Sequence, residues 1–209
     1  MKKWIALVLA LVLSLGLLGC ESAPAIEDPE ACKRALNGQS AVTMSLNYEA
    51  TQQATDLVID DTVAGRLQES GLLNTKWTVS VQKTDWLYMK FVTDSFVNQD
   101  EEGIVKGTTY GFFDSNDNPM GYMQLRAYPA QGVHYCQVFL DETGTPTGFY
   151  APEDGSVLYD IDNAQAAHGE FTLGFLSDST ITVTPDGVDI PFWIKLGMYQ
   201  AIYQDNEPN

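Results

Sequence analysis

Residues 114–119 read Asp-Ser-Asn-Asp-Asn-Pro, an arrangement of oxygen-bearing side chains that could bind a cation. It matches the first half of a calcium-binding EF-hand loop. The second half does not match, because Pro119 stands where that loop needs glycine and Leu125 stands where it needs a bidentate glutamate. We therefore interpret the segment as a hairpin turn and predict no metal site.

A second group with chemical potential is His134 and Cys136, with His168 as the only other histidine. Residues two apart share one face of a strand, so a Cys–His nucleophile or a His-Cys-His metal site is one interpretation. The other is a packed cysteine beside a partly exposed histidine, which we favour because two residues are a weak signal.

Known catalytic motifs are missing from the sequence. It contains no Gly-x-Ser-x-Gly, P-loop, dinucleotide-binding, His-Glu-x-x-His or Cys-x-x-Cys pattern. Adjacent acids such as Asp60-Asp61 carry little information in a chain with 28 Asp and Glu residues. We expect no cofactor and favour a protein that is not an enzyme.

Aromatic residues are the other candidates for a binding site. Trp86, Tyr88, Tyr110, Tyr122 and Tyr128 lie in a β-rich region and could form a platform for a sugar or a peptide. A β-rich core uses the same residue types, and we favour that alternative.

The composition predicts one folded domain with an appendage. Of the 209 residues, 44% are hydrophobic and 11% are aromatic, which is enough to build a single core. The net charge of −17 argues against a nucleic-acid partner, because phosphate contacts need clustered Lys and Arg.

The first 19 residues have the pattern of an export signal. Lys2-Lys3 precedes a run of apolar residues that is shorter than the roughly 20 needed to span a bilayer, and this argues against a transmembrane anchor. The run ends in Leu17-Leu18-Gly19-Cys20, which resembles the lipobox of bacterial lipoproteins. That resemblance implies lipidation of Cys20, a membrane partner reached through the lipid alone, and a place in the bacterial cell envelope on the non-cytoplasmic side.

Two cysteines remain once Cys20 carries lipid, namely Cys32 and Cys136. In an exported protein they can form a disulfide. The alternative is two unrelated thiols, one of them buried as a small apolar residue.

The pattern along the rest of the chain predicts the following elements. Residues 28–38 have the capping order of a short helix, and 61–70 could form a second one. Alternation of apolar and polar residues predicts strands over 40–48, 76–96 and 179–184. We divide the chain into a signal peptide (1–19), a lipidated tether with a short helix (20–38) and a single β-rich domain (39–209).

Between residues 108 and 173 three segments share one layout. Each has an aromatic or apolar residue followed by aspartate, a polar turn, and a small residue seven positions after the aspartate. The aspartates are Asp114, Asp141 and Asp160, and the small residues are Gly121, Gly148 and Ala167. Aspartate and asparagine suit tight turns, so the segments are predicted to be successive hairpins.

Residues 190–203 form a predicted helix that is apolar around most of its circumference, leaving a stripe near Lys195, Tyr199 and Gln200, with Asp189 as its cap. Such a helix must be buried on nearly all sides. We predict a mainly β protein of the β-rich α+β kind, an antiparallel barrel or curled sheet around this helix.

The hairpin motif, the strand after Ser177-Asp178-Ser179 and the apolar helix resemble the tubby-like barrel superfamily, which includes LURP-one-related and phospholipid-scramblase proteins. The resemblance implies a closed barrel threaded by its C-terminal helix. Phosphoinositide binding through basic residues does not carry over, because the matching strands have few of them.

The sequence thus favours a lipid-anchored exported protein that serves as a non-catalytic binding or structural module. One alternative is a hydrolase that acts on envelope material or nutrients through paired carboxylates in a cleft. Another is a small-ligand carrier with an open barrel interior.

Overall fold

The computed structural model describes residues 25–45, 55–70, 75–93, 104–128, 133–174 and 179–206. The predicted signal peptide, Cys20 and the last three residues of the strand predicted over 40–48 lie outside these ranges. The described helices are α2 (Pro29–Asn37) and α3 (Phe192–Asn206). The described strands are β1 (Val42–Ser45), β2 (Thr55–Ile59), β3 (Thr62–Ser70), β4 (Lys76–Val81), β5 (Thr84–Val92), β6 (Ile104–Asp114), β7 (Pro119–Tyr128), β8 (Val133–Leu140), β9 (Pro146–Pro152), β10 (Val157–Tyr159), β11 (Gln165–Thr172) and β12 (Thr180–Pro185).

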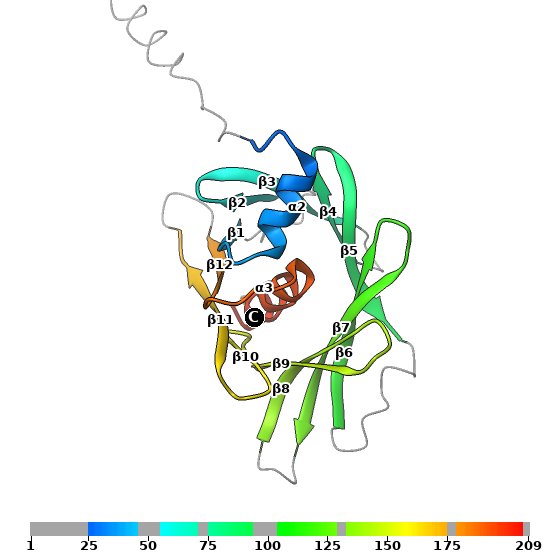
Figure 1. Ribbon diagram of the computed structural model, residues 1–209. Coiled ribbons are helices and arrows are strands. Elements are labelled where there is room, and N and C mark those ends of the chain that lie inside the picture. The colour runs from blue at the N-terminus through cyan, green and yellow to red at the C-terminus, as the bar shows by residue number, and fades with distance from the viewer. Residues whose placement is uncertain are drawn as a thin grey trace, which may run out of the picture.

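The strands form one closed antiparallel barrel in which each strand pairs with its neighbours in the chain (Figure 1). β1 closes the barrel because it pairs with both β2 and β12. At that seam Val42 is opposite Val183, and the hydroxyls of Thr43 and Thr182 are 2.9 Å apart. The predicted mainly β fold with an antiparallel barrel is confirmed.

Helix α3 lies inside the ring of strands (Figure 1). Its residues from Phe192 to Ile202 are all buried, which confirms the predicted apolar helix. The polar stripe of Lys195, Tyr199 and Gln200 is buried as well, at 0%, 5% and 3% exposure. A polar stripe on a helix reaches water only when one side of the helix is exposed. Here strands surround α3, so the stripe is buried.

Trp193 is a buried residue of α3, at 7% exposure. Its ring lies between Phe112 and Phe139, at centroid distances of 5.3 and 6.0 Å. A Cβ atom at Gly121 would stand 2.7 Å from the Trp193 ring and 2.7 Å from the Leu140 carbonyl oxygen. The small residue in the first predicted hairpin is therefore required by the approach of α3.

Helix α2 packs against strands β3 and β4 of the barrel. Asp28 accepts a hydrogen bond from the Glu30 amide at 3.0 Å, as the predicted helix cap requires. Cys32 and Leu36 are buried in the main core. The preceding residues are also held, because the Ile26 amide donates to the Val63 carbonyl oxygen at 3.2 Å.

The C-terminal end of α2 and the N-terminal end of α3 cap one another. The side-chain oxygen of Asn37 accepts a hydrogen bond from the Phe192 amide at 2.9 Å, so Asn37 has the role that the sequence suggested for Asp189. In return, the ammonium of Lys195 donates to the carbonyl oxygens of Leu36, Gly38 and Ser40 at 2.8, 2.9 and 3.0 Å.

The helix suggested over residues 61–70 is wrong, because this segment is strand β3. Asp60 and Asp61 both have positive φ, 46° and 60°, and Ile59 is paired with Thr62. Positive φ at two central residues is the geometry of a two-residue hairpin. Pairing with β2 on one side and β4 on the other then outweighs the weak local helix preference.

The three predicted hairpin turns are confirmed and share one geometry. The carboxylates of Asp114, Asp141 and Asp160 each accept hydrogen bonds from the amides two and four residues later, at 2.8–2.9 Å. The residue three positions after each aspartate has positive φ. Those residues are Asp117, Gly144 and Asn163.

Because these turns depend on ionised aspartates, we expect the protein to lose stability in acid. Hydrogen bonds from Asn118 hold the pKa of Asp114 below its usual 3.8, and hydrogen bonds from Thr143 do the same for Asp141. The stabilisation is present above about pH 4 and is lost as pH falls through the lowered values, because the unfolded chain binds protons first. In urea unfolding between pH 5 and 2, we expect Asp141→Asn to reduce the pH dependence and the control Glu142→Gln to leave it unchanged. An unchanged slope in Asp141→Asn would contradict the prediction.

Candidate functional site

The described ones among the five aromatic residues that were candidates for a binding platform do not form one surface. Tyr88, Tyr110 and Tyr122 are buried, at 6%, 3% and 3% exposure. Trp86 is half-buried and stacks on Phe192 of α3, with ring centroids 5.6 Å apart. Tyr128 ends β7, and its side chain lies outside the described part of the structure.

Tyr88 has a structural role on the outer face of the barrel. Its hydroxyl donates to the carboxylate of Asp117, the residue with positive φ in the first hairpin, at 2.6 Å. The Lys76 ammonium lies 3.7 Å from the centre of the Tyr88 ring. Burial, followed by the hydrogen bond to Asp117, raises the pKa of Tyr88 to about 12. This tyrosine holds the turn in place.

A second apolar cluster, which we call the outer cluster, lies on the face of the sheet that points away from α3. It consists of Tyr122, Cys136, Val138 and Leu140. Tyr122 is paired with Leu140 across β7 and β8, whereas the alternating residues Met123 and Phe139 belong to the main core. Tyr122 thus serves packing, the alternative that the sequence favoured.

Cys32 and Cys136 are free thiols, so of the two alternatives the structure shows unrelated cysteines. Cys32 lies in the main core and Cys136 in the outer cluster. Burial raises the pKa of both thiols, with Asp28 adding to the effect at Cys32 and Arg126 opposing it at Cys136. A raised thiol pKa disfavours the nucleophilic thiolate. The side chain of His134 lies outside the described residues.

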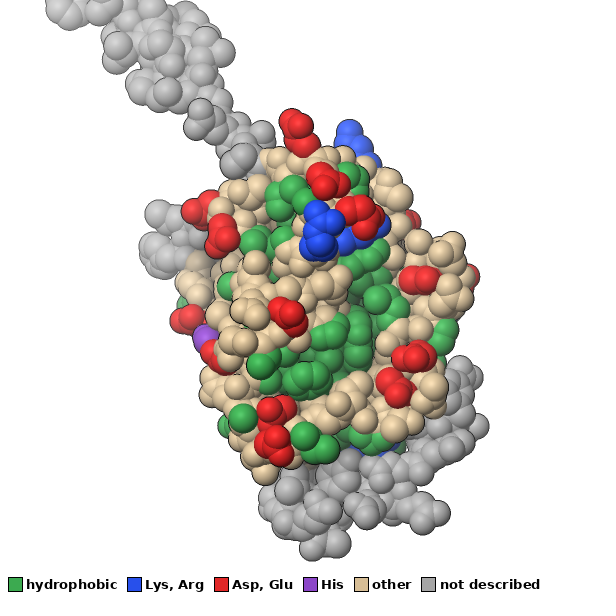
Figure 2. Space-filling view, viewed as in Figure 1, with side chains coloured by type: hydrophobic (Ala, Val, Ile, Leu, Met, Phe, Trp, Pro, Cys, Tyr) green, Lys and Arg blue, Asp and Glu red, His purple; other side chains and the backbone are tan. Residues whose placement is uncertain are grey.

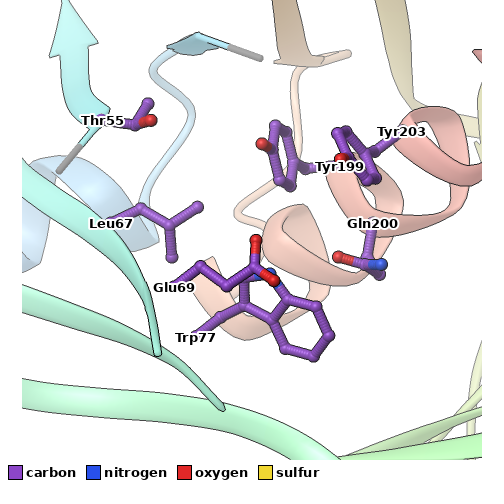
Figure 3. A pocket seen from close by; sticks show the side chains of 7 residues that line it. All are labelled: Thr55, Leu67, Glu69, Trp77, Tyr199, Gln200 and Tyr203. Atoms are coloured by element: carbon purple, nitrogen blue, oxygen red, sulfur yellow. The ribbon is translucent and has the colours of Figure 1, made fainter. Parts of the chain in front are cut away.

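Tyr110 is hydrogen-bonded to Gln200, which lines a recess beside the C-terminal half of α3. We call this recess the barrel mouth. The mouth is lined by Thr55, Leu67, Glu69, Trp77, Tyr199, Gln200 and Tyr203 (Figure 3). The space in it that the centre of a water-sized group can occupy is about 20 Å³, so the recess admits a small group.

One side of the mouth is formed by strands β3 and β4, and the other side by helix α3. Leu67 and Glu69 alternate with outward residues of β3, and Glu69 is paired with Trp77 of β4. Because Leu67 is in the main core, Glu69 points to the same interior side at the end of the strand. Tyr199 and Tyr203, one helical turn apart on α3, stack at 6.2 Å on the opposite side.

Gln200 is the polar group buried deepest in the mouth. Its amide nitrogen donates to the Tyr110 hydroxyl at 3.4 Å. Its oxygen Oε1 is buried and has no hydrogen-bond partner within the described residues. Figure 3 shows this oxygen on the side of the amide that faces Trp77 and Glu69. A buried acceptor without a partner costs about 1–3 kcal/mol, so this oxygen marks a position where a donor would bind favourably.

The pKa values of the carboxylates do not favour the alternative of a hydrolase with paired carboxylates. Within the described residues, those with a shifted pKa are Asp114, Asp141 and Asp186, and all three shifts are downward. At Asp186 burial opposes the shift, and hydrogen bonds from Gln165 and His168 outweigh it. A general acid of a hydrolase needs a raised pKa. In the same part of the chain, no group of three or more His, Cys, Asp or Glu could hold a metal ion.

Sequence reasoning missed most of the mouth. Trp77 was assigned to a strand and Gln200 to a polar stripe, but nothing in the spacing places Glu69 near either. The available signal was the conflict between a helix that must be buried and the polar residues Lys195 and Gln200 in it. Lys195 finds three acceptors, whereas the Gln200 oxygen finds none among the described residues.

Comparisons with known proteins find no matching family model, no matching curated protein and no matching solved structure. Neither helix in the described ranges has the length and apolar character needed to cross a membrane.

Proposed function

We propose that this protein is exported, anchored by lipid on Cys20 to the non-cytoplasmic side of a bacterial membrane, and that its barrel is a non-catalytic binding module. Its ligand enters the barrel mouth. The observation that carries the binding role is the buried Oε1 of Gln200, which has no hydrogen-bond partner among the described residues and lies in a recess with aromatic walls.

The filled interior supports this choice over a carrier. A carrier needs an open barrel, whereas the side chains of α3 occupy the space between the strands. A barrel threaded by its C-terminal helix is also what the tubby-like resemblance implies, and we propose a distant relationship on that basis.

The lipid anchor is tested by growing cells with an alkynyl fatty acid and detecting label on the protein. We expect label on the wild type, and a complete loss in Cys20→Ser because that thiol is the acceptor. Cys32→Ala is the control, and it should keep the label. Retention of label in Cys20→Ser would overturn the anchoring proposal.

Binding at the mouth is tested on the full-length chain in nonionic detergent micelles. The side chains of glutamine are labelled with ¹⁵N, and the Gln200 amide signal is identified by its absence in Gln200→Met. n-Butylammonium, butyrate, 1-butanol and glucose are titrated in turn. A saturable shift of the Gln200 signal by at least one probe supports the proposal, and no shift by any of them overturns it.

A further inference from the structure

We infer that the barrel mouth binds a primary ammonium group carried on a slender chain. This inference rests on the proposed binding function and names the class of ligand. Two acceptors, an aromatic wall and the small size of the recess lead to it.

The first observation is that acceptors point into the mouth from both sides. Gln200 offers a buried amide oxygen without a partner among the described residues. Glu69 offers a carboxylate, and this exposed side chain forms no ion pair in the described part of the chain. An ammonium group has three donors and no acceptor, so it matches a site that presents oxygen atoms.

The second observation is the aromatic wall. Trp77 and Tyr199 line the recess, and Trp77 also contacts Phe91 at 5.5 Å in an edge-on arrangement that fixes its ring. Aromatic faces attract cations, and Trp does so most strongly. The same faces pack against the methylene groups of an alkyl chain. A carboxylate ligand would instead meet Glu69 and the negative faces of these rings.

The third observation is size. The space that the centre of a water-sized group can occupy in the recess is about 20 Å³, which admits a small head group such as –NH₃⁺. A tetramethylammonium ion is several times larger than that group. Hydrogen bonds to the Gln200 oxygen also require N–H donors, which a quaternary ammonium lacks.

The charge of the whole molecule favours the same ligand class. The chain carries a net charge of −17, and Figure 2 shows acidic side chains scattered over one face, with most of the basic ones in its upper part. Such a field raises the local concentration of cations. Affinity for an ammonium should therefore fall as salt is added.

The decisive experiment titrates n-butylammonium into the ¹⁵N-glutamine-labelled, full-length protein described above. We expect a saturable shift of the Gln200 side-chain signal. Tetramethylammonium should bind at least tenfold more weakly, and butyrate and 1-butanol should not shift this signal. Equal affinity for tetramethylammonium and n-butylammonium would overturn the inference.

Variants test the two acceptors separately. Glu69→Gln keeps the shape of an exposed side chain and should weaken n-butylammonium about tenfold, as expected for the loss of a charged hydrogen-bond partner. Glu170→Gln removes the same charge from an exposed residue of β11 and should change affinity less than twofold. Equal affinities in these two variants would overturn the inference. Gln200→Met, followed by tryptophan fluorescence and checked by its melting curve, should weaken binding by a similar factor.

A further arm separates the two sources of a primary ammonium. Nα-acetyl-lysine N-methylamide presents the group as a lysine side chain does, and n-butylammonium presents it as a free amine. Tighter binding of the lysine derivative indicates a polypeptide partner, and tighter binding of n-butylammonium indicates a small amine. If butyrate, 1-butanol or glucose shifts the Gln200 signal and n-butylammonium does not, the inference fails while the proposed function stands.

Discussion

Replacing Trp193 by alanine is expected to lower the free energy of unfolding by about 3–5 kcal/mol. The ring lies inside the barrel between Phe112 and Phe139 and against Gly121. Strands on all sides of α3 prevent the site from collapsing around the cavity. Urea unfolding of the wild type and the variant measures the difference.

Trp86→Ala is the matched control for this prediction. Trp86 is half-buried at the end of the barrel and stacks on Phe192, so its removal leaves a space that water can fill. We expect a loss well below that of Trp193→Ala. Equal losses would show that α3 is not the centre of the packed core.

Replacing Lys195 by methionine is expected to lower the free energy of unfolding by about 3 kcal/mol. Methionine has a similar length but leaves the carbonyl oxygens of Leu36, Gly38 and Ser40 without their donor. Removal of the buried ammonium recovers part of its desolvation cost, which keeps the loss below the sum of three bonds. The end of α2 should become the first part to exchange its amide hydrogens.

The control for Lys195 is Lys33→Met, which removes an exposed lysine that pairs with Glu30 at 2.8 Å. Surface pairs of this kind contribute about 0–1 kcal/mol. A loss of the same size in both variants would contradict the capping role of Lys195.

Because of Lys195, we expect the free energy of unfolding to depend on pH above neutrality. Burial lowers its pKa from 10.5 to about 8, while Asp189 acts in the opposite direction. Between these two values the unfolded chain binds more protons than the folded one, so the contribution of this group to stability rises with pH. Unfolding measured from pH 7.5 to 10 should show this rise in the wild type relative to Lys195→Met. A difference between them that does not change with pH would contradict it.

Local features of the sequence predicted much of the fold. The three aspartate turns were predictable because each carboxylate bonds amides two and four residues away, so the signal and the structure lie within five residues. The burial of the C-terminal helix was predictable because its sequence is apolar around most of the circumference, and exposing such a surface to water is unfavourable. Alternation correctly predicted a strand at β4, where Trp77, Val79 and Val81 are buried.

Local signals failed where pairing across the barrel decided the outcome. Strand β3 has weak preferences of its own, and its neighbours β2 and β4 determine its conformation. The aromatic residues that could have formed a platform are separated for a related reason. Tyr122 of β7 is paired with Gly111 of β6, and Gly111 faces the side opposite to its neighbour Tyr110. Tyr110 therefore belongs to the main core and Tyr122 to the outer cluster.

By itself the sequence determined the secondary structure of the hairpins, the burial of the last helix and the mainly β class, because these depend on short-range hydrogen bonds and on hydrophobic periodicity. Only the tertiary structure decided which residues meet at the barrel mouth. Glu69 and Gln200 are 131 residues apart in the numbering, and their approach depends on the register of β3 and on the depth of α3 in the barrel. Barrel closure sets both, and no local pattern records it.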